Sequence, residues 1–175
     1  RPLVPILDTL SRPIDSTPLL NGLHVLLTRR LLDVFTGLGT ALRVWVYLHG
    51  RSYWMDEGSL LANIQGRAPF DFSGPLTSDQ LAPPGFLAAE RLIVMMFGGS
   101  PHATRLIPLA CGIAALFLFR RLVERLLTRP AAIVAMFFFA FGDDPVYYSN
   151  ELKPYASDLA IGLLITVLSL GELKE

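Results

Sequence analysis

The stretch Ser52-Tyr53-Trp54-Met55-Asp56-Glu57-Gly58 places two adjacent carboxylates just past a hydrophobic segment, with two aromatic rings in front of them. A tyrosine and a tryptophan next to an apolar run are typical of the membrane–water boundary, where amphipathic rings lie at the level of the lipid headgroups. Carboxylates at that level are hydrated enough to ionise and close enough to lipid to meet a lipid-linked molecule. The residues leave a second interpretation open, in which Asp56 caps a helix that begins at Glu57.

The composition of the 175 residues also favours a membrane protein. Hydrophobic residues make up 52% of the chain and charged residues only 17%, and the mean hydropathy is +0.47. The formal net charge is zero, so no nucleic acid or other acidic polymer is indicated as a partner. The single cysteine, Cys111, cannot form an intramolecular disulfide. No histidine has metal-ligand spacing, so a cofactor, including a divalent metal, stays unassigned.

Apolar runs with basic or aromatic flanks predict an all-α polytopic membrane protein with about four transmembrane helices. We place these spans at about 31–49, 105–123, 129–148 and 154–172. No uncharged run reaches the roughly 18 residues that make a span secure, so a soluble helical bundle is the alternative. Terminal arginine, lysine and tyrosine side chains that extend toward water can lengthen each span. Arg43 lies inside the first span and must therefore face protein or reach the interface.

Two amphipathic helices are expected in the long segment between the first two spans. Apolar residues recur at helical spacing after Asp56-Glu57, and a second apolar helix covers 85–97. That second helix contains Glu90 and Arg91, which we interpret as a pair on the helix surface. Both helices are expected to lie flat in the membrane interface. The chain is accordingly divided into an N-terminal arm with a surface helix (1–30) and a transmembrane module (31–175).

Basic residues orient the predicted helices. Arg29-Arg30 and the cluster from Arg120 to Arg129 fall at one surface of the membrane, which the excess of positive charge identifies as cytoplasmic. The acidic pair at 56–57 and the polar motif at 150–158 then share the opposite surface. Two acidic clusters that are distant along the chain are thus expected to face one another outside the bilayer.

Five short motifs follow one another over this hydropathy profile. They are Trp54-Met55-Asp56-Glu57, Gln80-Leu81-Ala82-Pro83-Pro84, Phe97-Gly98, Arg105-Leu106-Ile107-Pro108 and Tyr148-Ser149-Asn150-Glu151-Leu152-Lys153-Pro154-Tyr155. Together they resemble the GT-C glycosyltransferases, over about Leu31 to Gly171. The likeness is greatest to the family 39-type branch, with the protein O-mannosyltransferases, the lipid A aminoarabinose transferases and uncharacterised bacterial relatives. It implies an integral membrane enzyme that moves a sugar from a polyprenyl-phosphate carrier to an acceptor on the non-cytoplasmic face.

The resemblance also implies roles for individual residues. Asp56, the first acidic residue after the first span, would be the general base that takes a proton from the acceptor. Glu57 would orient the acceptor or support the base. The other implied candidates are the donor-phosphate contacts Arg105 and Lys153 and a second acidic site, Asp158, with Glu151 as a near competitor. Cations beside a departing phosphate supply electrostatic stabilisation, and a single displacement inverts the anomeric centre.

The chain departs from the family in two respects. Protein O-mannosyltransferases have His-Pro-Pro where this chain has Ala82-Pro83-Pro84, which argues against that subgroup. The family also has more spans and often a soluble C-terminal domain, so we expect this chain to be the N-terminal portion of a longer enzyme. The alternative is a non-catalytic or truncated membrane module or assembly subunit. A transporter ranks last, because no internal repeat is found.

The expected surroundings follow from the resemblance. The chain would lie in a bacterial inner membrane, with its active site facing the periplasm or exterior. Its partners would be membrane lipid and the polyprenyl-phosphate sugar donor, whereas the sugar, the acceptor and the oligomeric state are left open.

Overall fold

The computed structural model describes residues 17–68, 71 and 74–172, and within these ranges it contains helices and no strand. The predicted all-α class is therefore confirmed. Residues 1–16 of the expected N-terminal arm lie outside the described residues. The helices are α2 (Thr17–Leu48), α3 (Met55–Gly66), α4 (Pro84–Phe97), α5 (Pro101–Thr104), α6 (Leu106–Leu126), α7 (Arg129–Phe141), α8 (Asp143–Tyr148) and α9 (Tyr155–Glu172).

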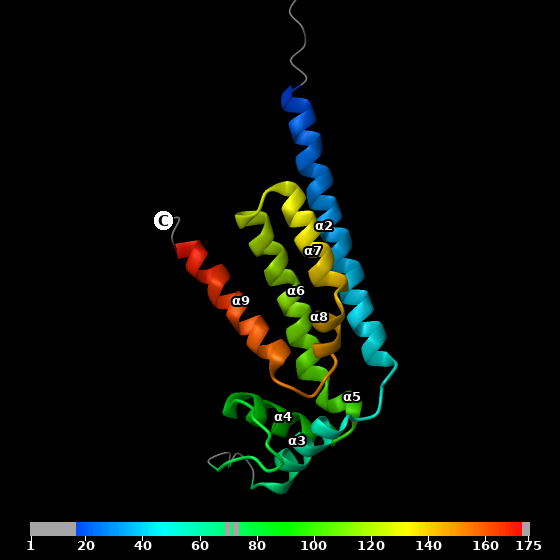
Figure 1. Ribbon diagram of the computed structural model, residues 1–175, viewed down its shortest axis with the longest axis vertical. Helices are drawn as coiled ribbons and strands as arrows, with labels where there is room; N and C mark the ends of the chain where they lie inside the picture. Colours follow the sequence, from blue (N-terminus) through cyan, green and yellow to red (C-terminus); the bar gives the residue numbers. More distant parts are fainter. Residues whose placement is uncertain (1–16, 69–70, 72–73, 173–175) are drawn as a thin grey trace, which may run out of the picture.

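The helices form a bundle with a smaller layer at one end. Helix α6 packs against α9 on one side and against α2 and α7 on the other, and α2 and α7 pack together. Figure 1 shows these four helices running along the long axis of the molecule, with α3, α4 and α5 gathered at the lower end. Leu32, Leu116, Met136 and Ala140 form the buried core between α2, α6 and α7.

Two helices in the described part of the chain are long and apolar enough to cross a membrane. They are Gly22–Leu48 in α2 and Pro101–Leu126, which joins α5 and α6. The apolar helices Arg129–Phe141 and Tyr155–Gly171 are shorter. The expected third span is interrupted at Gly142, where α7 ends and the short helix α8 begins. Two of the expected spans thus meet the length that a bilayer requires.

Helix α2 differs from the sequence prediction in its length. A surface helix before Arg29-Arg30 and a separate first span were expected, but one continuous helix covers Thr17–Leu48. The expected domain boundary at residue 30 therefore falls inside a helix. The physical reason is that two arginines do not interrupt a helix, since arginine is among the better helix formers.

Arg43 faces protein, as its position inside a span required. Its side chain is buried, and Nη1 donates to the carbonyl oxygens of Gly39 and Ala140, both at 3.0 Å. Nη2 donates to the Phe139 carbonyl at 3.1 Å, and Nε donates to Ser149 Oγ at 3.1 Å. The carbonyls of Phe139 and Ala140 belong to the last turn of α7, which lacks helical partners. One guanidinium therefore satisfies the end of α7 and ties α2 to the turn after α8.

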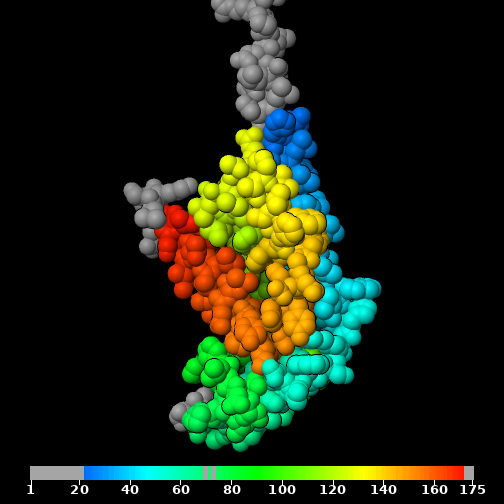
Figure 2. Space-filling view, viewed as in Figure 1, coloured from blue at the N-terminus to red at the C-terminus, as the bar shows by residue number. Residues whose placement is uncertain are grey.

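The end layer is built by α3 and α4, close to where both amphipathic helices were predicted. Space-filling shows this layer lying against the lower end of the bundle (Figure 2). A buried cluster joins the two helices to the turn before α9; its members are Leu60, Leu61, Ile64, Phe86, Leu87 and Leu152. The layer and the turn before α9 therefore share one hydrophobic core.

The prediction that Glu90 and Arg91 form a pair on the helix surface is wrong. Glu90 shares one face of α4 with Phe86 and Leu87 and is 0% exposed, and neither of its carboxylate oxygens has a hydrogen-bond partner. Arg91 Nη1 instead donates to the carbonyl of Ile64 at 3.0 Å. The spacing puts Glu90 on the side of α4 that packs inward. Burial raises the pKa of Glu90 to about 8, so this carboxyl is largely neutral at pH 7.

Candidate functional site

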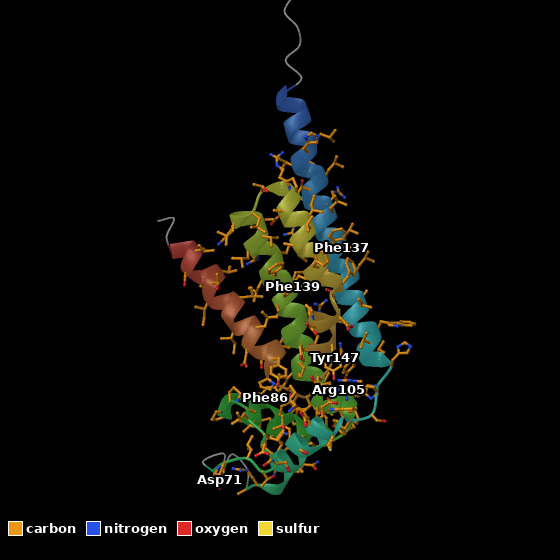
Figure 3. The ribbon with its side chains drawn as sticks, in the orientation of Figure 1. Asp71, Phe86, Arg105, Phe137, Phe139 and Tyr147 are labelled. Atoms are coloured by element: carbon orange, nitrogen blue, oxygen red, sulfur yellow. The ribbon has the colours of Figure 1, made fainter. Side chains whose placement is uncertain are left out.

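Glu57 and Arg105 form a buried ion pair where α3 meets the start of α6. Arg105 Nε donates to Glu57 Oε1 at 2.9 Å, and Nη2 donates to Oε2 at 2.8 Å. Glu57 is 0% exposed and Arg105 only 3%. Figure 3 places Arg105 at the junction between the bundle and the end layer. A two-point contact of this kind fixes both side chains in orientation.

Glu57 also receives two backbone hydrogen bonds. The Leu152 N–H donates to Oε1 at 2.8 Å, and the Trp54 N–H donates to Oε2 at 3.0 Å. Burial would raise the pKa of Glu57, but the hydrogen bonds from Arg105, Leu152 and Trp54 outweigh it and hold that pKa below its ordinary value. The ionised carboxylate therefore joins the start of α3, the start of α6 and the turn before α9. Glu57 is 0% exposed, so its contacts position these three segments and leave its carboxylate closed off from solvent.

The alternative role of Asp56 as a helix cap is wrong. Helix α3 begins at Met55, so Asp56 lies inside its first turn, and Trp54 occupies the capping position. Glu57, three residues after Trp54, accepts the Trp54 N–H as the acidic member of a capping box does. Because Glu57 carries out the capping contact, the Asp56 carboxylate is left on the surface.

Asp56 and Lys153 bring together two of the predicted motifs. The Asp56 side chain is 57% exposed, and Lys153 Nζ lies 3.6 Å from Asp56 Oδ2. Lys153 Nζ also donates to Gln80 Oε1 at 2.8 Å. Gln80 begins a third motif, so segments near residues 56, 80 and 153 converge at one place. The structure thus brings the motifs at 56–57 and 150–158 together, and their common place outside a bilayer stays a prediction.

Arg105 is placed beside this site, but its guanidinium is held by protein. Besides Glu57, it donates from Nη1 to the Arg51 carbonyl at 2.7 Å and from Nη2 to the Ser52 carbonyl at 3.3 Å. The Arg105 Cζ lies 5.5 Å from the centroid of the Tyr53 ring. These contacts leave little of Arg105 for an incoming phosphate, so the geometry favours an indirect role, in which Arg105 shapes segment 51–57.

Arg51 is a cation that the sequence prediction missed. Its side chain is 39% exposed, with Nη2 3.9 Å from Glu57 Oε2. Its guanidinium also lies over the Tyr147 ring, 4.3 Å from the centroid. The available signal was its position between the end of the first span and the aromatic pair at 53–54, on the same side as Asp56. Asp56, Glu57, Arg51, Arg105 and Lys153 are named here the Asp56 cluster. Among its three cations Arg51 is exposed, whereas Lys153 is 8% exposed and Arg105 3%.

Glu151, the competitor for the second acidic site, joins the cluster. It is 5% exposed, and the Tyr147 hydroxyl donates to its Oε1 at 3.4 Å. Burial and the nearby charge of Glu57 raise the pKa of Glu151 against the opposing effects of Arg51 and Lys153. Asp158, the first choice, is exposed in the first turn of α9 and makes no side-chain ion pair or hydrogen bond to another described residue. The geometry therefore favours Glu151 over Asp158.

Two hollows flank the cluster. One, of about 450 Å³, opens beside Gln80 and is lined by Leu76, Leu81 and Leu87 among others. The other, of about 200 Å³, is lined in part by Arg51, Arg105 and Asn150. Within the described ranges no three His, Cys, Asp or Glu side chains are grouped so that they could hold a metal ion. A small polar ligand could thus reach Gln80, the hydrogen-bond partner of Lys153, from one side and Arg51 from the other.

Comparison of the chain with protein-family models, with curated proteins and with solved structures finds no significant match.

Proposed function

We propose that the chain is an integral membrane glycosyltransferase of the GT-C type. It would move a sugar from a polyprenyl-phosphate-linked donor to an acceptor on the non-cytoplasmic face. One observation carries the proposal: an exposed carboxylate, Asp56, stands 3.6 Å from the Lys153 ammonium at one end of an apolar helical bundle. A base and a cation side by side are what transfer from a lipid phosphate requires.

In the proposed reaction Asp56 accepts the proton of the acceptor hydroxyl. The hydroxyl oxygen then forms a bond to the anomeric carbon as the bond from that carbon to the phosphate oxygen breaks, which inverts the anomeric centre. The phosphate leaves with the bonding electron pair, and Lys153 and Arg51 balance its charge. Glu57 and Arg105 act through position, because their mutual contact holds segment 51–57 against the turn at 152.

Exposed apolar side chains support a lipid environment for the bundle. On α9 the exposed residues include Ile161, Ile165 and Leu168, each more than half exposed, and on α7 Phe138 is 66% exposed. Large apolar surfaces of this kind would be unfavourable in water. We therefore propose that α7 with α8, and α9, are the third and fourth spans, although each is short. The membrane would be a bacterial inner membrane, with Asp56 facing the periplasm.

The test is a transfer assay on the full chain reconstituted in liposomes, with a panel of polyprenyl-phosphate sugars as donors. Asp56→Asn removes the base while preserving shape, and we expect it to abolish transfer without changing membrane insertion. The matched control is Asp143→Asn, since Asp143 is exposed at the start of α8 and outside the cluster. An Asp56→Asn protein that transfers sugar at the wild-type rate would refute the proposal.

A non-catalytic membrane module is the second candidate function. The observation that favours it is that Glu57 and Arg105 direct their hydrogen bonds to one another and to the neighbouring backbone, as residues with a purely structural role would. Such a module would show no transfer by the wild-type chain with any donor of the panel, although it inserts normally.

A further inference from the structure

A further cavity, lined by both charged and apolar residues, lies at the far end of the bundle from Asp56. It has a volume of about 350 Å³ and is walled by α2, α6 and the start of α7. Its size falls within the range of about 300–1,000 Å³ that is usual for ligand pockets. Three arginines from three different helices, Arg29, Arg125 and Arg129, line it. Neither the proposed reaction nor the Asp56 cluster uses this cavity.

The positive charge of the cavity is only partly compensated by its own walls, where three arginines stand against one carboxylate. Glu124, the acidic residue on the wall, is held by Arg120, with Nη1 3.1 Å from Oε2. Arg120 also pairs with Asp33 at 2.6 Å. Arg125 donates to the Val167 carbonyl at 3.3 Å, a contact that leaves its charge intact.

Two of the three arginines have free guanidinium groups. Arg29 and Arg129 are exposed and make no side-chain hydrogen bond or ion pair to any residue in the part of the chain that the structure describes. Both guanidinium groups are thus available to an anion. Thr28, also on the wall, adds a hydroxyl, although it donates to the His24 carbonyl at 2.9 Å.

We propose that this cavity binds the phosphate headgroup of an anionic phospholipid. Guanidinium groups match phosphate oxygens in pairs, and basic pockets between transmembrane helices on the cytoplasmic side suit anionic headgroups. The remaining wall is apolar, with Leu32 and Ala132. Leu127, also on the wall and 43% exposed, continues this apolar surface outward. The headgroup of a phospholipid would contact the arginines and its acyl chains would contact the apolar wall. A free phosphate would contact only the arginines.

The general excess of positive charge on cytoplasmic loops does not account for this arrangement. Arg30 and Arg121 would serve membrane orientation equally well, and both are exposed, but neither lines the cavity. They therefore provide matched controls, since each is close in sequence to a cavity arginine and carries the same charge.

The experiment measures lipid retained by the full chain in mixed micelles, with phosphatidylglycerol, phosphatidylcholine and inorganic phosphate offered separately. We expect wild-type protein to retain phosphatidylglycerol in preference to phosphatidylcholine. The double variant Arg29→Gln/Arg129→Gln should bind phosphatidylglycerol at least about tenfold more weakly. Arg30→Gln/Arg121→Gln, with the same change in net charge, should bind as the wild type does.

Several results would overturn this inference. Equal weakening in both double variants would show a diffuse charge effect, and inorganic phosphate that displaces the lipid efficiently would show a simple anion site. If a variant folds poorly, the measurement on the wild-type protein still tests the inference. A wild-type protein with no preference for phosphatidylglycerol over phosphatidylcholine would contradict it.

Discussion

Replacing Glu57 by glutamine tests the connection on which the site geometry depends. Each carboxylate oxygen of Glu57 accepts one bond from Arg105 and one from a backbone N–H. A glutamine amide fills the same space, but in either orientation its NH₂ group faces two donors. Arg105 is then left buried without its counter-ion. Breaking one partner of a buried pair costs about 3–5 kcal/mol, so we expect Glu57→Gln to lower the free energy of unfolding by about that amount.

The measurement is reversible unfolding of the purified chain in mixed micelles, followed by circular dichroism. Asp158→Asn is the control, because that carboxylate is exposed in the first turn of α9 and makes no side-chain ion pair or hydrogen bond to another described residue. Combining Glu57→Gln with Arg105→Met removes the uncompensated charge and should recover part of the loss. A Glu57→Gln protein within about 1 kcal/mol of the wild type would refute the reasoning.

Two further predictions concern the packing of the helices. The pKa of Glu90 is raised to about 8 in the fold, above about 4.3 in an unfolded chain, so unfolding releases its proton between these values. The free energy of unfolding should therefore fall as pH rises through this window, by up to about 1.4 kcal/mol per pH unit. Unfolding measured from pH 6 to 8 should show this slope for the wild type and not for Glu90→Gln. Gly39→Ala should destabilise the bundle by about 1–3 kcal/mol, because the new Cβ would lie 3.0 Å from the Ala140 Cβ and 3.2 Å from the Ala140 backbone. The control Gly37→Ala should be neutral or slightly stabilising, because its Cβ would meet no atom within 4 Å. Equal thermal unfolding of the two alanine variants would contradict the close approach of α2 and α7.

Local sequence signals were sufficient for the helices of the end layer. Gly66 ends α3, and Pro84 starts α4 just after Pro83, so turn-forming residues mark both helices in the sequence. The meeting of Asp56 with the 150–158 motif was also predicted, from the expectation that charge asymmetry between loops places both segments at one surface of a membrane. Both inferences rest on properties that a short stretch of chain carries by itself.

The partners of individual side chains were not predictable in this way. Arg105 and Glu57 are 48 residues apart, and whether that arginine meets a carboxylate or a ligand depends on how α3 docks under α6. Glu90 was misplaced for a related reason, since a charged residue next to Arg91 looks exposed until the packed face of α4 is known. Arg51 was passed over because no local pattern distinguishes a cation at a functional site from one that ends a span.

The most direct test is of the claim that the Asp56 cluster and the arginine cavity lie on opposite faces of a membrane. In a Cys111→Ala background, which removes the chain's one cysteine, a single cysteine is introduced as Asp56→Cys or as Arg121→Cys. Cells with intact inner membranes are treated with a maleimide that cannot cross the bilayer. We expect the Asp56→Cys protein to be labelled directly and the Arg121→Cys protein only after permeabilisation. Labelling of both at the same rate before permeabilisation, or the reverse pattern, would contradict the account.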